Sequence, residues 1–127
     1  MEQKYKELYI QALRASENAY SPYSHFKVGA ALLCSDGSVF TGVNVENSSY
    51  GATICAERSA LSAAITAGKR DFEAIAVASP GASAYPCGIC RQVIFEFGDK
   101  IKVITGTDEN NLDVTDIQSL LVKGFRL

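Results

Sequence analysis

Three cysteines constrain the fold of this chain more than any other feature. Cys55 opens the run CAE, so that Glu57 stands two positions after it, and Cys87 and Cys90 belong to the later run PCGIC. If the three thiols bind one metal ion, the two segments must meet in space and a fourth position on the metal stays open. An open metal beside a carboxylate is the arrangement that activates water for hydrolysis.

Both cysteine groups stand where a helix is predicted to begin. The segment between Cys55 and Gly68 has apolar residues at helical spacing, and a second helix is predicted from Cys87 to a point before Gly98. Cys87 and Cys90 are three positions apart on a first turn, so both sulfurs can face one point. Unpaired N–H groups at a helix N-terminus lower the pKa of a thiol, which suits three thiolates.

The rest of the chain alternates between helix and strand patterns. A helix is predicted over residues 5–19, strands over 28–34, 38–43, 74–79 and 101–105, and a last helix over 114–121. Asp36-Gly37 favours a hairpin between the first two strands, and strands joined by helices should run parallel. We therefore predict an α/β fold with three α-β-α layers, whose mixed central sheet has an antiparallel hairpin first and parallel strands after it. In such sheets ligands bind beyond the carboxyl ends of the parallel strands.

Length and charge limit the possible partners. The 127 residues contain no repeats or long linkers, so we predict one domain over residues 1–127. A formal net charge of -2 offers no basic surface for a nucleic-acid backbone. No apolar run approaches the ~20 residues that span a bilayer, and the charged start lacks the apolar stretch of a signal peptide. We expect a cytoplasmic protein with reduced thiols and no nucleic-acid or membrane partner.

Soft thiolates select zinc, and the other candidate ligands are weaker. Cys34 ends an apolar run and is expected to be a small buried hydrophobe. His25 precedes a strand and is expected at the surface. For Cys87 and Cys90 two alternatives stay open, a redox dithiol and half of a structural zinc site. The first would not require Cys55, and the second would need a fourth protein ligand.

Charged neighbours of the thiols are the next candidates for chemistry. Three thiolates around Zn²⁺ leave a net charge of about -1, which makes the metal a poorer acid. Arg58 and Arg91 are both close enough in sequence to donate hydrogen bonds to sulfur. We favour this role for Arg58, whereas a surface position is equally plausible for Arg91. Glu57 is the predicted proton shuttle, the alternative being a glutamate that only stabilises a helix N-terminus.

Beyond these residues, the chain resembles the small, zinc-dependent cytidine deaminases. The likeness rests on the all-cysteine form of the zinc deaminase pattern, on residues 20–31 (YSPYSHFKVGAA) and on residues 42–51 (GVNVENSSYG). It covers nearly the whole chain. The resemblance implies the family's fold and one zinc per subunit. It also implies hydrolytic deamination of cytidine, and of 2′-deoxycytidine, to uridine or deoxyuridine and ammonia in pyrimidine salvage.

The resemblance also implies which residues bind the substrate. Asn44 and Glu46 would hydrogen-bond the ribose hydroxyls, Phe26 would pack against the pyrimidine, and Ala56 would belong to the same site. The family typically forms homotetramers whose sites lie between subunits. Phe125 matches a C-terminal phenylalanine that reaches a neighbour's base. Family members often carry Leu-Leu-Pro before that aromatic residue, whereas this chain has LLVKG.

Two other functions fit part of the pattern. A related aminohydrolase that acts on a modified cytosine or on guanine would keep the three cysteines and Glu57. A structural zinc module that mediates protein contacts would need four protein ligands and would be indifferent to Glu57. Deamination of nucleic acid is the least compatible with the acidic balance of the chain.

Overall fold

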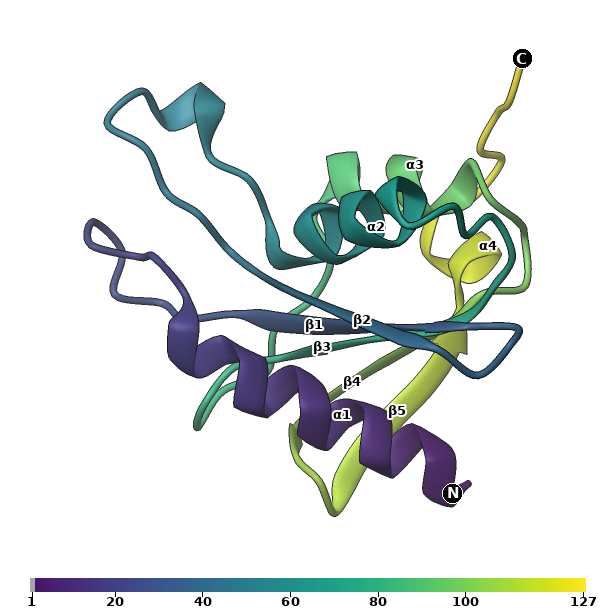
Figure 1. Ribbon diagram of the computed structural model, residues 1–127, viewed down its shortest axis with the longest axis horizontal. Helices are drawn as coiled ribbons and strands as arrows, with labels where there is room; N and C mark the ends of the chain where they lie inside the picture. The colour runs from purple at the N-terminus through teal and green to yellow at the C-terminus, as the bar shows by residue number, and fades with distance from the viewer. Residues whose placement is uncertain (1) are drawn as a thin grey trace.

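The computed structural model describes residues 2–127 and arranges them as a sheet between two layers of helices (Figure 1). The strands are β1 (Gly29–Cys34), β2 (Val39–Val43), β3 (Phe72–Ala78), β4 (Lys102–Asp108) and β5 (Asn111–Asp116). The helices are α1 (Gln3–Ala15), α2 (Ala56–Thr66), α3 (Gly88–Phe95) and α4 (Ile117–Leu120), with short 3-10 turns η1 (Ser16–Asn18) and η2 (Tyr50–Ala52). None of the helices within residues 2–127 has the length and hydropathy that a membrane span requires.

The sheet is mixed, as the sequence predicts. Its strand order is β2-β1-β3-β4-β5. β1 pairs antiparallel with both β2 and β3, β3 pairs parallel with β4, and β4 pairs antiparallel with β5. Helix α1 covers one face, whereas α2, α3 and α4 lie on the other (Figure 1). The predicted three-layer α/β architecture is therefore confirmed.

The prediction of a last helix over residues 114–121 is wrong in its first part. Residues 111–116 form the edge strand β5, and the helix α4 begins only at Ile117. The cause is burial with a period of two: Leu112 and Val114 pack against the apolar cluster under α1, while the residues before and between them are exposed. A strand satisfies that pattern and a helix does not.

Two apolar clusters join the helices to the sheet. Because successive side chains of a strand point to opposite faces, Leu32 joins the cluster under α2 and Ala31 joins the cluster under α1. Helix α1 buries Leu8 and Tyr9 almost completely against its face of the sheet. Cys34 belongs to the α2-side cluster and is 2% exposed, so its prediction as a buried hydrophobe is confirmed.

The pairing of β1 places both cysteine groups at one end of the sheet. Val43, the last residue of β2, and Ala78, the last residue of β3, both pair with Gly29 at the start of β1. The loop after β2 leads to α2, and the loop after β3 leads to α3. Both helices therefore begin beside the carboxyl ends of these strands, where Cys55 and Cys87 stand.

Candidate functional site

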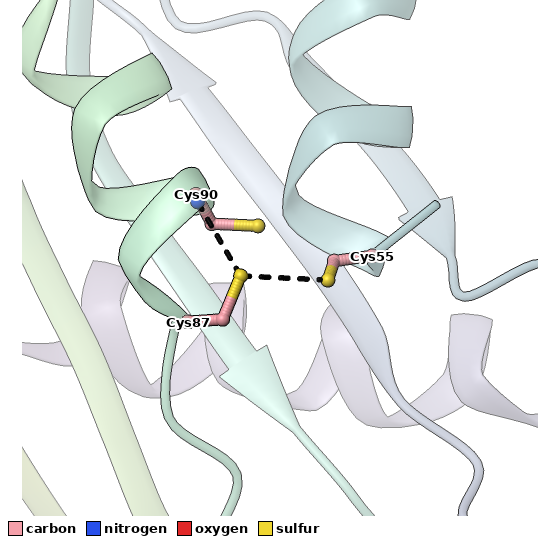
Figure 2. A group of neighbouring side chains, drawn as sticks. All are labelled: Cys55, Cys87 and Cys90. Atoms are coloured by element: carbon pink, nitrogen blue, oxygen red, sulfur yellow. Dashed lines mark hydrogen bonds between the residues drawn. The ribbon is translucent and has the colours of Figure 1, made fainter. Parts of the chain in front are cut away.

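Three cysteine sulfurs converge between the starts of α2 and α3 (Figure 2). Cys55 is the N-cap of α2, Cys87 is the N-cap of α3, and Cys90 lies in the first turn of α3. Their Sγ atoms all lie within 4.8 Å of one another. The Sγ atoms of Cys55 and Cys87 are 3.7 Å apart, and the backbone N–H of Cys90 donates to Cys87 Sγ at 3.4 Å. The structure thus brings together the three thiols that the sequence predicts as ligands.

The surroundings of these sulfurs favour a bound cation. Hydrogen bonding by the Cys90 thiol, and then by the Arg58 guanidinium, lowers the pKa of Cys55 to about 5. The hydrogen bond with Cys55 and burial raise the pKa of Cys90. The negative charge of the Cys55 thiolate therefore disfavours ionisation of Cys90. A cation bound between the sulfurs would offset this repulsion. A compact set of soft thiolates at two helix N-termini fits Zn²⁺.

Arg58 is the cation that contacts the sulfur cluster. Its Nη2 donates to Cys55 Sγ at 3.6 Å and to the carbonyl oxygen of Thr53 at 3.4 Å. The hydrogen bond with Cys55 raises the pKa of Arg58, so its charge is permanent. Within residues 2–127 the buried Nε of Arg58 has no hydrogen-bond partner. The structure thus places Arg58 within hydrogen-bonding distance of one of the three sulfurs, and its charge-compensating role stays a prediction.

Arg91 has a different set of partners. Its Nε donates to the carbonyl oxygen of Pro86 at 2.9 Å, and its Nη1 donates to the carbonyl oxygen of Leu120 at 3.1 Å. Both acceptors are backbone atoms, so the side chain fastens the start of α3 to the end of α4. Of the two arginines considered as sulfur donors, Arg58 donates to a sulfur, whereas Arg91 donates to backbone carbonyl oxygens and has a structural role.

Glu57 is a buried carboxyl group beside the sulfurs. It lies in the first turn of α2 and is 3% exposed. Burial raises its pKa to about 7, and the negative charge of Cys55 acts in the same direction. A group with such a pKa can both accept and release a proton near neutral pH. The metal-binding cluster within residues 2–127 comprises the three cysteines and does not include Glu57.

A cavity of about 270 Å³ opens beside this cluster. Its volume is near the lower end of the ~300–1,000 Å³ range of small-molecule sites. The lining includes two of the thiols and five of the other residues predicted to act on the substrate, namely Phe26, Asn44, Glu46, Ala56 and Glu57. A wider depression of about 570 Å³ lies at the opposite end of β3, around Phe72 and Arg126, and no thiol lines it. The smaller cavity is therefore the candidate substrate site.

Asn44 stands at the wall of the cavity with part of its hydrogen-bonding capacity in use. Its Oδ1 accepts from the backbone N–H of Val28 at 3.0 Å, and its Nδ2 donates to the carbonyl oxygen of Phe26 at 2.8 Å. An amide side chain has two donors and two acceptor lone pairs. One N–H and one lone pair of Asn44 thus remain for a ligand.

Glu46 is anchored by the loop that precedes β1. Its carboxylate accepts from the backbone N–H groups of Tyr23 and Ser24 at 2.9 and 3.1 Å, and from the Ser24 hydroxyl at 2.5 Å. These bonds, the Ser24 hydroxyl foremost, lower the pKa of Glu46. The group is thus an ionised acceptor, which suits the hydroxyl of a sugar.

Phe125 and His25 lie outside the cavity of their own chain. Phe125 is 67% exposed on the C-terminal tail, where its carbonyl oxygen accepts from Gln92 Nε2 at 3.2 Å. Arg126 fixes the same tail because its Nε donates to the carbonyl oxygen of Phe95 at 2.7 Å. His25 is exposed, as predicted from the sequence.

Five residues that line the cavity were not predicted from the sequence as site residues, namely Ser24, Val28, Thr53, Ala84 and Tyr85. Ser24 contacts Glu46, and Tyr85 is 66% exposed at the opening, immediately before the PCGIC run. Tyr85 could have been found from its place beside the ligand loop. Ser24 gives no comparable signal, because only the fold shows that its hydroxyl meets Glu46.

Comparison with known sequences points to one family. Residues 2–107 match the family model described as the cytidine and deoxycytidylate deaminase zinc-binding region. The chain is 48% identical over 117 residues to a cytidine deaminase of Halalkalibacterium halodurans, which is 91% of this chain and 89% of that protein. A probable cytidine deaminase of Dictyostelium discoideum is 54% identical over 102 residues, or 78% of this chain and 69% of that protein.

Comparison with solved structures agrees. The crystal structure of a cytidine deaminase from Burkholderia pseudomallei superposes with a TM-score of 0.89 at 46% identity, covering 98% of this chain and 100% of that one. A cytidine deaminase from Mycobacterium tuberculosis gives a TM-score of 0.88 at 38% identity, over 99% of this chain and 100% of that one. The likeness therefore extends over the sheet, both helical layers and the loops that form the cavity.

Proposed function

The chain belongs to the cytidine and deoxycytidylate deaminase family, and from that premise we propose that it hydrolyses cytidine to uridine and ammonia, and 2′-deoxycytidine to deoxyuridine. The observation that carries this proposal is the buried Glu57 beside three convergent thiols, in a cavity that Asn44 and Glu46 also line. Such a site joins a water-activating centre to acceptors and donors for a sugar.

The three thiols are the proposed metal site. Cys55, Cys87 and Cys90 would hold one zinc ion per subunit. Zinc bound there supplies the acidity that lets water act as a nucleophile near neutral pH. Arg58 donates to Cys55 and so offsets part of the negative charge of the thiolates.

Glu57 is the proposed carrier of protons. Its carboxylate takes a proton from the attacking water and delivers it to N3 of the pyrimidine, while the water oxygen bonds to C4. Glu57 then takes the remaining proton from the new hydroxyl on C4 and passes it to the amine on the same carbon. The C4–N bond breaks, ammonia leaves and the C4 carbonyl of the product forms. The pKa of about 7 suits both directions of transfer.

The remaining cavity residues are proposed to hold the nucleoside. Phe26 packs against the pyrimidine, and the free donor and acceptor sites of Asn44 and Glu46 take the ribose hydroxyls. Ala56 lines the cavity between Cys55 and Glu57, where it limits the space around the base.

We further propose a homotetramer whose sites are shared between subunits. Large apolar side chains remain mostly exposed in the single chain, including Tyr50 at 78% and Phe125 at 67%. Exposed aromatic side chains of this kind commonly mark surfaces that other proteins cover. In the proposed assembly Phe125 reaches the base in a neighbouring subunit, since it does not reach the cavity of its own chain.

The biological setting is part of the proposal. Residues 1–127 would act as a single catalytic domain in pyrimidine salvage. The four cysteines are free thiols, and three of them must stay reduced to bind a metal, which favours the cytoplasm.

A substrate panel tests the proposed specificity. Purified zinc-loaded protein is incubated separately with cytidine, 2′-deoxycytidine, cytosine and guanine, and ammonia release is measured. We expect rapid release from the two nucleosides and little from the free bases. A free base has no sugar hydroxyl to form hydrogen bonds with Asn44 and Glu46. Preferential release from guanine or cytosine would instead support a different aminohydrolase.

A further inference from the structure

We propose that Ser24 is a positioning residue that couples sugar binding at Glu46 to the placement of Phe26 against the base. This inference rests on the proposed function, because it takes Glu46 and Phe26 as contacts of the nucleoside. Ser24 itself was not predicted from the sequence and is identified by its hydrogen bonds.

The Ser24 hydroxyl connects the two contacts directly. Ser24 Oγ donates to Glu46 Oε2 at 2.5 Å. Ser24 Oγ also accepts from the backbone N–H of Phe26 at 3.0 Å. A hydroxyl has one proton and two lone pairs, so both bonds form with a single orientation of the side chain. A displacement of Glu46 is thereby transmitted to the backbone of Phe26.

The backbone of Phe26 is held from both sides. Its N–H is bound by Ser24, and its carbonyl oxygen accepts from Asn44 Nδ2 at 2.8 Å. All four residues of this chain of hydrogen bonds, Ser24, Phe26, Asn44 and Glu46, line the candidate cavity. The proposed sugar contacts therefore also fix the residue proposed to meet the base.

The backbone between Ser24 and Phe26 needs such support. His25 has a φ of 59°, in the left-handed region that residues other than glycine seldom adopt. Its backbone N–H donates to the carbonyl oxygen of Ser21 at 3.0 Å. A conformation of this kind persists when the surrounding bonds determine it. The turn directs Phe26 toward the cavity, and the Ser24 hydroxyl is one of the bonds that maintain it.

Glu46 keeps limited room for a substrate. Its Oε1 already accepts two N–H groups and its Oε2 accepts the Ser24 hydroxyl. A carboxylate offers about four lone-pair sites, so the site left open is on Oε2, next to Ser24. A sugar hydroxyl that binds there shares an oxygen atom with Ser24.

The test compares Ser24→Ala with Ser24→Thr, which keeps the hydroxyl. Ser24 is exposed, so the threonine methyl group has space. With cytidine as substrate, Ser24→Ala should raise KM roughly ten- to hundredfold, the range for a lost hydrogen bond to a charged group, with kcat changed less than about threefold. Ser24→Thr should restore KM to within about threefold of the wild type. Zinc content should be equal in all variants.

Tyr23→Phe is the matched control. It removes a hydroxyl from the same loop, one that contacts Ser48 at 2.6 Å and not Glu46. Its KM should stay within about threefold of the wild-type value. A KM effect as large as that of Ser24→Ala would overturn the inference, since general loosening of the loop would then explain both.

A double-mutant cycle isolates the coupling. In the Glu46→Ala background, Ser24→Ala should lower kcat/KM by less than about threefold further, because the hydrogen bond between the two side chains is already lost. Full additivity in that background, an unchanged KM in Ser24→Ala, or failure of Ser24→Thr to restore KM would contradict the role of Ser24. Absence of cytidine turnover by the wild-type protein would contradict the proposed function itself, and the two failures are thus distinguishable.

Discussion

At the residue scale, Cys55 and Glu57 stand two positions apart and have pKa values that are shifted in opposite directions. Burial raises the pKa of Glu57 to about 7, whereas hydrogen bonds from Cys90 and Arg58 lower the pKa of Cys55 to about 5. An ordinary cysteine is a much weaker acid than an ordinary glutamic acid, so the two environments reverse the usual order of acidity. Strongly shifted pKa values of this kind are typical of functional sites. Here the low pKa suits a metal ligand and the high one suits a proton carrier.

Replacement of Glu57 by glutamine separates these two roles. Glu57→Gln keeps the size of the side chain and removes its ability to exchange protons. The variant should retain zinc and lose at least ~10²–10⁴-fold in kcat, the usual range for a general acid–base group. Zinc analysis and steady-state assays with cytidine measure both. Full activity with normal zinc content would exclude Glu57 as the carrier.

Arg58 should lower the pKa of Cys55 in addition to the larger effect of the Cys90 thiol. Because the folded pKa of Cys55 lies below its ordinary value of 9.0, its ionisation stabilises the fold above pH 9, and this contribution is lost as the pH falls through about 5. Arg58→Ala should shift the thiolate titration of the zinc-free protein to higher pH and weaken zinc binding roughly 10–100-fold. Ultraviolet absorbance of the thiolate and a competing chelator measure the two effects.

Arg91→Ala is the control for that experiment. It removes an arginine that is just as close to a ligand in sequence but bonds to backbone carbonyls. Its thiolate titration should match the wild type. Equal shifts in the two arginine variants would mean that the contact between Arg58 and Cys55 does not set the pKa.

The sequence predicts residues whose chemistry is local and misses those defined by distant partners. Cys55, Cys87, Cys90 and Glu57 follow a spacing that indicates metal-assisted hydrolysis by itself. The Leu120 acceptor of Arg91 and the Glu46 acceptor of Ser24 lie on other segments, 29 and 22 residues away. Only the folded chain shows which of several donors meets which acceptor.

At the scale of elements, the position of α2 depends on its contact with β2. A Cβ atom added to Gly42 would lie 2.3 Å from the backbone nitrogen of Ala60 and 2.7 Å from the carbonyl oxygen of Ala56. The helix therefore packs directly on the strand backbone. That contact fixes the start of α2, which carries Cys55 and Glu57 into the site.

Gly42→Ala should displace α2. Because the clash is with backbone atoms, we expect a loss of about 1–3 kcal/mol in the free energy of unfolding, together with faster zinc release. Urea unfolding and chelator kinetics measure these quantities. The control is Gly51→Ala, where an added Cβ meets nothing within 4 Å, and it should change stability by less than about 0.5 kcal/mol. Equal effects at both positions would contradict this view of the packing.

Element prediction succeeds where one pattern dominates and fails where two overlap. The apolar spacing of α1 and the hairpin at Asp36-Gly37 both appear in the structure. Val114 and Ile117 stand three positions apart, as in a helix, yet Leu112 and Val114 also alternate as in a strand. Pairing with β4 decides for the strand, and the Asp116 carboxylate then caps α4 by accepting from the Ser119 N–H at 3.0 Å.

At the scale of the whole molecule, a shared site predicts complementation. Glu57→Gln and Phe125→Ala proteins should each have reduced activity. When they are unfolded, mixed and refolded together, some sites combine the intact Glu57 of one subunit with the intact Phe125 of another. Cytidine deamination by the mixture should exceed the sum of the two proteins refolded alone, and light scattering should show tetramers. No gain in a mixture that forms tetramers would contradict a Phe125 contact across subunits.

The most direct test of the central claim is cytidine turnover by zinc-loaded protein, followed as uridine and ammonia in the same reaction. The account predicts that both products appear in equal amounts, that a chelator abolishes their formation, and that added zinc restores it. Glu57→Gln loaded with zinc should remain inactive. Absence of turnover by the zinc-loaded wild-type protein, or equal turnover after complete removal of the metal, would contradict the assignment of Cys55, Cys87, Cys90 and Glu57 as the site of hydrolysis.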